Sequence, residues 1–387
     1  MNTVNIKING MPLSVPAGST ILQAAKSAGI DIPTLCYLKD LNEIGACRMC
    51  VVEVKGARSL VASCVYPVNE GMEVFTNTPK VIESRKMTLE MLLSVHNKSC
   101  LTCKRSGTCE LQALCQELGV EDSTSYEGAM PDSLYDDSTY HLVRDNSKCI
   151  LCRRCVAACA NQHVAVIGPN SRGFDTHIGC MFEQPLANVA CVSCGQCIVA
   201  CPTGALTEKD QCADVLAALN DPTKYVVVQT APSIRATLGE CFGMPVGTNV
   251  EGKMVAALRR LGFRKVFDTD FGADLTIMEE ANEFIERVQN GGTLPMITSC
   301  SPGWVKFCEY YFPELLPNVS SCKSPQQMTG AMIKTWFAEK EGLDPKDIVV
   351  VSVMPCTAKK FEIHRDDMNA AGEEIPDTDI VLTTREL

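Results

Sequence analysis

The sequence contains the same four-cysteine pattern twice. Residues 149–160 read CILCRRCVAACA and residues 191–202 read CVSCGQCIVACP, so both follow the spacing C-x2-C-x2-C-x3-C. The start of the chain lacks a basic region followed by an apolar core, and no apolar run approaches the roughly 18 residues that span a membrane. We therefore expect a cytoplasmic protein without a membrane segment, in which thiols stay reduced. The 23 cysteines then indicate metal ligands before disulfides.

The doubled pattern resembles that of bacterial ferredoxins with two 4Fe-4S clusters. In that fold the fourth cysteine of each run ligates the other cluster. The resemblance therefore implies one cluster held by Cys149, Cys152, Cys155 and Cys201, and another held by Cys191, Cys194, Cys197 and Cys159. Cys159 precedes an alanine where proline is usual, and Cys180 between the runs has no assigned role. We assign this domain to residues 140–211.

A first cysteine group precedes these runs and consists of Cys36, Cys47, Cys50 and Cys64. Before it, two short alternating stretches meet at Asn9-Gly10, which is a hairpin signal, and a helical pattern then stops at Gly29. Residues 1–78 thus resemble the plant-type 2Fe-2S ferredoxin domain, a β-grasp fold, in the variant at the head of complex I large subunits, some formate dehydrogenases and some hydrogenases. Because C-x2-C also serves zinc, a zinc loop is the alternative.

A second group consists of His96, Cys100, Cys103 and Cys109. It resembles the 4Fe-4S site with one histidine and three cysteine ligands that follows the 2Fe-2S domain in those families, and we assign it to residues 79–125. The spacing alone leaves zinc as an equal competitor. Helical apolar spacing in PKVIESRKMTLEMLLSVH places His96 near a helix end. Cys115 is expected to be a buried thiol.

Strand-like and helical runs alternate from about residue 222 to residue 387. This alternation predicts an α/β domain with a mostly parallel sheet, so the whole chain is expected to be a multidomain α+β protein. Three apolar runs, each expected to be a strand, end at Ala231-Pro232-Ser233, Ser299-Cys300-Ser301 and Pro355-Cys356. Ligands of such sheets bind outside the carboxyl ends of the strands, and we therefore expect Cys300 and Cys356 at one edge.

Two segments of this region, TSCSPGW (298–304) and MPCTAKKFE (354–362), resemble signature motifs of the FeFe hydrogenases of clostridial type. The sequences TAPSIR, FGADLTIMEE and SSCKSPQQ fit as well, and with the upstream clusters the resemblance covers essentially all 387 residues. It implies reversible reduction of protons to dihydrogen at an H-cluster, a 4Fe-4S cubane joined to a two-iron unit with CO, CN and dithiolate ligands. One 2Fe-2S and three 4Fe-4S clusters are implied to feed it.

The resemblance also implies roles for individual residues. Cys356 is expected to ligate the cubane, Cys300 to pass protons to the two-iron unit, and Lys359 to donate a hydrogen bond to a cyanide. The residues implied to line the two-iron unit are Ala231, Pro232, Ser233, Gln326 and Met354. Buried donors matter there, because an anionic ligand in an apolar cavity is costly unless it is paired.

A proton relay to Cys300 is implied at Glu280, Glu283, Arg287 and Ser320. The first three are spaced i, i+3 and i+7 on one predicted helix and share a face. The alternative from the residues themselves is a solvated face with an ion pair between Glu283 and Arg287.

Two departures from the resemblance concern the H-cluster. Ser301 stands where the family commonly has a second cysteine that ligates the cubane. Either Ser301 binds as an alkoxide, or Cys300 changes role, or the cubane is held differently. The family's third motif lies downstream of TTREL, which reads as the opening of a helix, so we expect a fragment or a truncated relative.

Three functions compete on the sequence: a hydrogenase, a multi-cluster electron-transfer protein with an incomplete site, and a relative of complex I or formate dehydrogenase large subunits. The hydrogenase motifs after residue 222 favour the first. The net charge of −11 argues against a nucleic-acid partner. Expected partners are a ferredoxin or NADH-oxidising flavin and Fe-S subunits, together with hydrogenase maturation factors.

Overall fold

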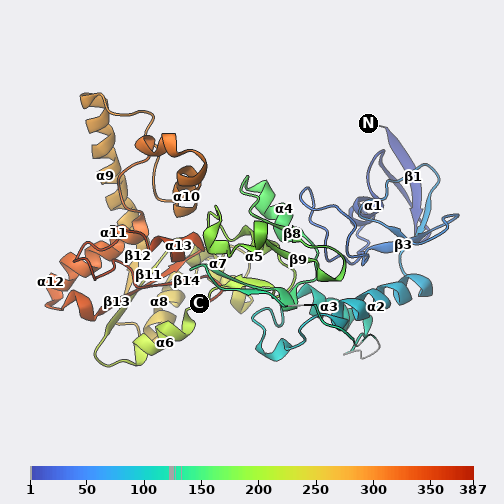
Figure 1. Ribbon diagram of the computed structural model, residues 1–387, viewed down its shortest axis with the longest axis horizontal. Helices are drawn as coiled ribbons and strands as arrows, with labels where there is room; N and C mark the ends of the chain where they lie inside the picture. The colour runs from blue at the N-terminus through green and yellow to red at the C-terminus, as the bar shows by residue number, and fades with distance from the viewer. Residues whose placement is uncertain (1, 122–125, 127, 132) are drawn as a thin grey trace. The chain divides into compact units, whose positions relative to one another are not determined.

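The computed structural model describes residues 2–121, 126, 128–131 and 133–387. The chain forms two compact units (Figure 1), of which the first comprises Met1–Ser138, Val143–Val189 and Gln196–Thr207. The second comprises Thr139–Leu142, Ala190–Gly195 and Glu208–Leu387. The four predicted domain boundaries remain predictions, and the ends that we set at residues 1 and 125 lie outside the described residues.

The first unit begins with a five-stranded sheet in the order β2-β1-β5-β3-β4. Its strands are β1 (Thr3–Ile8), β2 (Met11–Pro16), β3 (Val51–Val54), β4 (Val61–Ala62) and β5 (Glu73–Phe75). The predicted hairpin is present, because Asn9 and Gly10 take positive φ between β1 and β2. Helix α1 (Ile21–Ser27) packs into the core of this sheet, and Thr20 and Gln23 form its capping box.

One helix precedes the second cysteine group in the sequence, and another follows it. Helix α2 (Pro79–Ser94) ends two residues before His96, as the apolar spacing predicted. Helix α3 (Glu110–Leu118) carries Cys115, which is only partly buried and packs against the core beneath α2. A short 3-10 turn, η1 (Cys100–Thr102), lies between the two helices.

The doubled cysteine runs each lead into a helix, α4 (Arg154–Asn161) and α5 (Gln196–Ala200). Strands β8 (Ile167–Asn170) and β9 (His177–Cys180) form a hairpin between the runs. A three-stranded sheet has the order β10-β7-β6, with β6 (Tyr135–Asp136), β7 (Leu142–Asp145) and β10 (Leu206–Glu208). The short 3-10 turns of this region are η2 (Asn146–Lys148), η3 (Gly173–Asp175), η4 (Met181–Glu183) and η5 (Leu186–Asn188).

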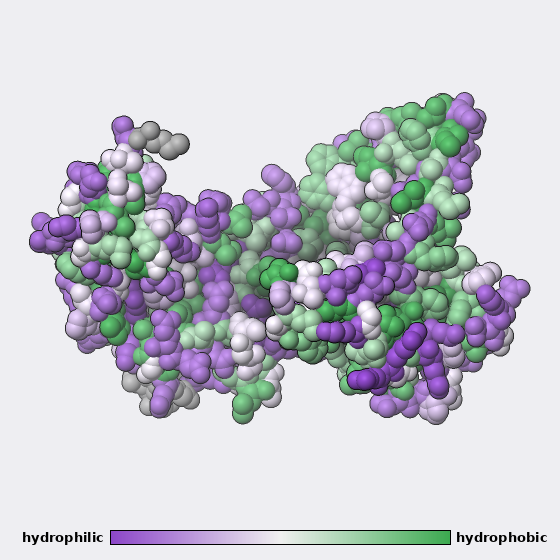
Figure 2. Space-filling view, turned by 180° about the vertical axis from the view of Figure 1, so that it is seen from behind, coloured by the Kyte–Doolittle hydropathy of each residue, from purple (hydrophilic) through white to green (hydrophobic). Residues whose placement is uncertain are grey.

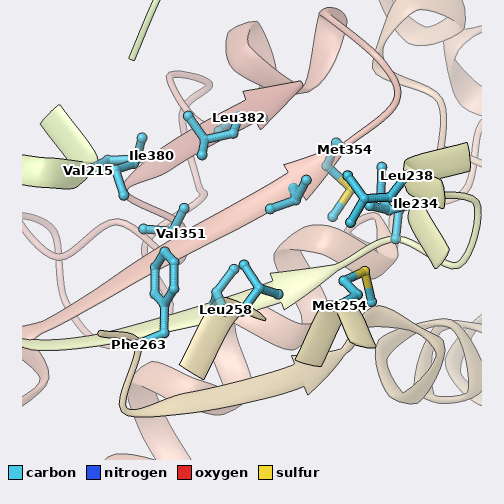
Figure 3. Close-up of a cluster of buried hydrophobic side chains, with 14 of the residues drawn as sticks. Val215, Ile234, Leu238, Met254, Leu258, Phe263, Val351, Met354, Ile380 and Leu382 are labelled. Atoms are coloured by element: carbon cyan, nitrogen blue, oxygen red, sulfur yellow. The ribbon is translucent and has the colours of Figure 1, made fainter. Parts of the chain in front are cut away.

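The second unit is built on a four-stranded parallel sheet in the order β12-β11-β13-β14, which confirms the predicted parallel α/β arrangement. Its strands are β11 (Tyr225–Thr230), β12 (Lys265–Asp268), β13 (Ile348–Met354) and β14 (Ile380–Thr383). Buried residues of β11, β13 and β14 pack against residues of α6 (Cys212–Asn220), α7 (Ile234–Thr237) and α8 (Glu251–Leu261), as Figure 3 shows. This core anchors the strand ends at which the predicted site lies.

The remaining elements of the second unit follow the predicted alternation with one exception. The helices are α9 (Thr269–Asn290), α10 (Pro302–Tyr311), α11 (Pro325–Met332), α12 (Ala338–Glu341) and α13 (Ala358–Glu362). The 3-10 turns are η6 (Leu238–Phe242), η7 (Pro313–Asn318) and η9 (Pro345–Asp347), and a π-helical turn, η8 (Ile333–Phe337), joins α11 to α12. The strand expected at residues 294–300 is wrong, because this segment forms only an isolated bridge between Ile297 and Val319.

Helix α9 exposes several large apolar side chains, and Figure 2 shows such residues at the surface over this part of the chain. The most exposed among them are Phe271, Ile277, Met278, Ile285 and Val288. Glutamates and an arginine interrupt the apolar residues of α9. Among the described residues, no helix combines the length and the apolar character that crossing a membrane requires.

Candidate metal centres and active site

The four cysteines of the first group lie within hydrogen-bonding reach in two pairs. The amide of Cys36 donates to Cys47 Sγ at 3.4 Å, and the amide of Cys47 donates to Cys36 Sγ at 3.5 Å. The hydrogen bond with Cys36 lowers the pKa of Cys47 to about 6, and the hydrogen bond with Cys64 lowers the pKa of Cys50 to about 6. The same hydrogen bonds raise the pKa of Cys36 and of Cys64 above the usual range, so each pair shares one proton. Iron binds thiolates, and four sulfurs gathered in two such pairs fit a small cluster whose metal replaces the shared protons.

His96 of the second group is largely buried, and burial lowers its pKa to about 4. Its Nδ1 atom is buried without a hydrogen-bond partner in the described part of the chain, which is unusual for a ring nitrogen and fits a metal ligand. Burial raises the pKa of Cys109, and the nearby Cys103 and Cys100 add to this shift. The three cysteines therefore lie near one another, as a shared cluster requires.

The third predicted ligand set is gathered around one cavity. Cys149, Cys152, Cys155 and Cys201 all line it, together with apolar residues such as Ile178. Burial raises the pKa of Cys149 to about 11 and that of Cys152 to about 12. Burial also raises the pKa of Cys155. Four cysteines around one cavity, three of them with thiols that are costly to ionise, fit a site in which bound iron replaces their protons. The cavity also brings the last cysteine of the second run to the first three of the first run.

The first half of the second cysteine run belongs to the second unit. Thr357 Oγ1 donates to the carbonyl of Ser193 at 2.8 Å. A Cβ added at Gly195 would lie 2.5 Å from Thr357 Oγ1, and Gly195 has a φ of +72°, so only glycine fits there. His141 is 2% exposed, and its Nε2 lies 3.8 Å from Cys191 Sγ. The ligand set that Cys191 is predicted to form with Cys194, Cys197 and Cys159 remains a prediction from the motif.

The carboxyl ends of β11 and β13 lie side by side at the predicted edge of the sheet. The amide of Ala231, just after β11, donates to the carbonyl of Val353 at 3.0 Å. Cys356 follows β13 by two residues, and Lys359 Nζ of the next helix donates to the carbonyl of Cys300 at 3.0 Å. The structure therefore brings the segment of Cys300 to that of Cys356, although Cys300 does not end a strand.

A buried polar network lies behind this edge. Glu362 Oε2 accepts hydrogen bonds from Lys359 Nζ at 3.0 Å, Ser324 Oγ at 2.9 Å and Gln326 Nε2 at 3.1 Å. Gln326 Oε1 in turn accepts from Ser352 Oγ on β13 at 2.6 Å. These contacts fix the amide orientation of Gln326 and hold the ammonium of Lys359 beside Cys300, where it can donate to an anion.

The other residues predicted to line the two-iron unit differ in exposure. Ala231 is buried, whereas Pro232 and Ser233 are exposed. Met354 is 3% exposed and belongs to the apolar core (Figure 3). Ser301 is the N-cap residue of α10, but its side chain makes no capping hydrogen bond.

Three of the four predicted relay residues, Glu283, Arg287 and Ser320, meet on one side of α9. Glu283 Oε2 accepts from Ser320 Oγ at 2.7 Å, and Arg287 Nε donates to Glu283 Oε1 at 3.1 Å. The ion pair that we considered as the alternative is therefore present and is also hydrogen-bonded to Ser320. Glu280 does not join these contacts: its Oε1 is buried without a hydrogen-bond partner among the described residues.

Sequence reasoning missed two residues next to these sites. Cys322 Sγ lies 3.8 Å from Glu283 Oε2, and the carbonyl of Cys322 accepts a hydrogen bond from Ser299 Oγ, one residue before Cys300. His141 is the second. His141 belongs to no motif, whereas Cys322 lies within SSCKSPQQ, two residues after Ser320, and that position could have drawn attention to it.

Models of known protein families match four successive parts of the chain. Residues 1–79 match the 2Fe-2S iron-sulfur cluster binding domain, and residues 85–124 match the NADH-ubiquinone oxidoreductase-G iron-sulfur binding region. Residues 148–205 match the 4Fe-4S dicluster domain, and residues 224–387 match the C-terminal domain of the iron only hydrogenase large subunit. The chain thus contains iron-sulfur domains of ferredoxin type followed by a hydrogenase domain.

Whole proteins give the same result. The chain is 50% identical to the NADP-reducing hydrogenase subunit HndD of Solidesulfovibrio fructosivorans, over 100% of this chain and 68% of the relative. It is 44% identical to iron hydrogenase 1 of Clostridium pasteurianum, over 99% of this chain and 66% of the relative. The chain therefore spans about two thirds of the length of these curated relatives.

A solved structure, that of NAD+-reducing [NiFe]-hydrogenase in the H2-reduced state, matches with a TM-score of 0.50 and 30% identity, over 53% of this chain and 87% of that chain. The match to HndD, which extends over the whole of this chain, rules out a complex I or formate dehydrogenase large subunit as the best description. The chain belongs to the family of iron-only, or FeFe, hydrogenase large subunits.

Proposed function

We propose that the protein catalyses the reversible reduction of protons to dihydrogen. The observation that carries this proposal is the contact between Lys359 Nζ and the carbonyl of Cys300 beside Cys356. It joins the two hydrogenase motifs at the edge of a parallel sheet, which is where such sheets bind ligands. An H-cluster at this edge would supply the redox chemistry, and Cys356 would ligate its cubane.

We further propose one 2Fe-2S and three 4Fe-4S clusters as the path of the electrons. Three of the four ligand sets are supported by hydrogen-bonded thiols, by the unpartnered ring nitrogen of His96, and by the cavity shared by four cysteines. The sixteen proposed ligands are Cys36, Cys47, Cys50, Cys64, His96, Cys100, Cys103, Cys109, Cys149, Cys152, Cys155, Cys159, Cys191, Cys194, Cys197 and Cys201.

The chain's own residues would move and position protons at the site. Glu283 and Ser320 share a hydrogen bond, and Arg287 holds the Glu283 carboxylate in place. The Cys300 thiol would deliver the proton, with Glu280 completing the relay. Lys359, held by Glu362, would donate to an anionic ligand, and Ala231, Pro232, Ser233, Gln326 and Met354 would line the site.

Ser301 favours one second candidate, an electron relay with an incomplete catalytic site. Serine oxygen is a harder and poorer ligand for iron than thiolate. A cubane that lacks this ligand would leave the upstream clusters able to carry electrons without dihydrogen turnover.

The partners we propose are a ferredoxin or the NAD(P)H-linked flavin and Fe-S subunits of a larger enzyme, because one relative is named as a subunit of an NADP-reducing hydrogenase. Maturation factors would assemble the two-iron unit. A reducing compartment such as the cytoplasm suits a chain with 23 cysteines in cluster spacing, because thiols stay reduced there and can bind iron.

The test is dihydrogen evolution by the protein after maturation, with a paired cysteine control. We expect activity in the parent and in Cys241→Ala, whose exposed cysteine has no assigned role, and none in Cys356→Ala. Activity that survives Cys356→Ala would refute the assignment of the site. An inactive parent that still holds about fourteen iron atoms, as one two-iron and three four-iron clusters require, would favour the electron relay.

A further inference from the structure

His141 lies outside every motif, yet it is one of the most deeply buried polar residues of the second unit. It is 2% exposed, and its Nε2 faces Cys191 Sγ at 3.8 Å, within hydrogen-bonding range for sulfur. The two residues are 50 positions apart in the sequence, so this contact is a product of the fold. Cys191 is a proposed ligand of the second ferredoxin-type cluster, and the inference rests on that part of the proposed function.

The direction of this hydrogen bond follows from chemistry. A cysteine bound to iron is a thiolate and carries no proton, so its sulfur can only accept. The hydrogen must then come from the imidazole, which fixes the tautomer with the proton on Nε2. A neutral imidazole in this tautomer is a donor aimed at the cluster.

A positive group lies in the same place. Lys306 Nζ is 3.5 Å from Ser193 Oγ, two residues after Cys191, and lies 3.9 Å from the centre of the Phe361 ring. The segment of residues 191–193 therefore has the imidazole of His141 beside Cys191 and the ammonium of Lys306 beside Ser193. Both stabilise negative charge, and a reduced cluster carries one more negative charge than an oxidised one.

We propose that His141 is a positioning residue that donates a hydrogen bond to the Cys191 thiolate and raises the reduction potential of this cluster. The cluster then accepts an electron more readily than it would without the donor. Thr357, which follows Cys356, donates a hydrogen bond to Ser193 in the loop that carries Cys191. An electron held by this cluster would therefore lie next to the segment that carries Cys356.

The test is a redox titration of the full chain, reconstituted with iron and sulfide and followed by EPR. Three variants are compared with the parent. His141→Leu removes the donor, His141→Gln restores an N–H near the same place, and His177→Leu removes a histidine whose contacts in the structure are with Asp175 and Glu183.

We expect His141→Leu to lower the potential of one four-iron signal while the 2Fe-2S signal stays unchanged. Loss of one hydrogen bond to an anion changes the ratio of reduced to oxidised cluster by up to about tenfold, which equals about 59 mV for a one-electron couple. His141→Gln should recover most of the shift, and His177→Leu should show none.

Unchanged potentials in His141→Leu at full iron content would overturn the proposal. Loss of about four iron atoms in both His141 variants would also overturn it, because His141 would then be needed to hold the cluster and not to tune it. The parent's iron and sulfide content tests the proposed clusters separately, since a parent without four-iron signals refutes the proposed function before any variant is compared.

Discussion

Glu362 places a single carboxylate oxygen against three donors, and it is 3% exposed. Lys359, its cationic partner, is 9% exposed. Removing one member of a buried ion pair leaves the other charge without compensation, which costs more than the pair itself contributes. The position of the Lys359 ammonium beside Cys300 therefore depends on Glu362.

We expect Glu362→Ala to lower the free energy of unfolding by about 3 kcal/mol, because it leaves the Lys359 ammonium buried and unpaired. Urea unfolding followed by circular dichroism measures this change. Glu341→Ala is the control, since its pair with Lys265 spans 3.9 Å at the surface. It should change stability by less than about 0.5 kcal/mol. Equal losses in the two variants would contradict the role of Glu362.

The ionisation of Glu283 gives a prediction on pH. Burial opposes its ionisation, but hydrogen bonds from Ser320 and Arg287 outweigh burial and hold the pKa of Glu283 below its usual value of 4.5. The ionised carboxylate therefore contributes stability that is fully present above about pH 4.5 and is lost as the pH falls through the lower folded-state value.

Accordingly, Glu283→Gln should be less stable than the parent at pH 7, and the difference should shrink below about pH 4.5. The midpoint of urea unfolding at several pH values measures this. Glu286→Gln, at an exposed position of the same helix, should track the parent at every pH. A difference for Glu283→Gln that is the same at pH 7 and at pH 4 would contradict the prediction.

Single residues differ in how far the sequence could predict them. Cysteine spacing indicates candidate iron ligands because a loop must wrap around a cluster, and that constraint is local. The contacts of His141 with Cys191 and of Cys322 with Glu283 join segments 50 and 39 positions apart. No local pattern records such contacts, because they depend on how the elements pack.

Among the elements, α9 and α11 pack closely against each other at Gly272. A Cβ added at Gly272 on α9 would collide with Thr329 Oγ1 and with the carbonyl of Pro325 on α11. The carbonyl belongs to the backbone and cannot turn aside. Glycine at this position therefore sets the distance between the helix that carries the relay residues and the helix that carries Gln326.

We expect Gly272→Ala to destabilise the protein by about 2 kcal/mol, because overpacking at the crossing outweighs the gain in helix propensity. Gly252→Ala in α8 is the matched control, since a Cβ there meets nothing within 4 Å. It should stabilise the protein by up to about 1 kcal/mol. Thermal unfolding of the two variants measures the contrast, and stabilisation by Gly272→Ala would disprove the tight crossing.

Element prediction succeeded where periodicity was long and failed where it was short. The α8 and α9 helices and the β11 and β13 strands follow the sequence patterns. The apolar run at 294–300 is not a strand of the sheet: Ile297 donates to Asn318 and accepts from Ser320, so it pairs with a neighbouring loop. A run of this length carries too little periodicity to show which partner it will find.

At the scale of the whole molecule, the chain passes several times between its two compact units. The second unit takes in Thr139–Leu142 and Ala190–Gly195, which lie far from its main segment in sequence. Within it, Tyr140 stacks on His364 with ring centres 3.9 Å apart, and Thr357 binds Ser193. The family models match four successive regions of the chain, three with cysteine motifs and one of hydrogenase type. They could not predict that these two short segments, the excursions of the chain into the second unit, belong there. A motif is contiguous in sequence, whereas a compact unit need not be.

A fragment of residues 208–387 should therefore unfold at a lower urea concentration than the same region of the full chain, because it lacks both excursions. A fragment of residues 139–387 retains them and should recover most of the difference. Hydrogen exchange at the amides around Thr357 reports this region directly. Equal protection in both fragments would show that the excursions contribute nothing.

The close packing of Gly195 against Thr357 limits how recombination can join the iron-sulfur domains of one such protein to the hydrogenase domain of another. The matched family ranges leave a gap between residues 205 and 224, which looks like a natural crossover point. A crossover there would separate the glycine from the threonine that fills the space of its missing Cβ. A new catalytic partner would be accepted only if its residue at that place has a similar shape. The two halves should thus be inherited together, and the second ferredoxin-type loop should evolve with the hydrogenase domain and not with its own repeat.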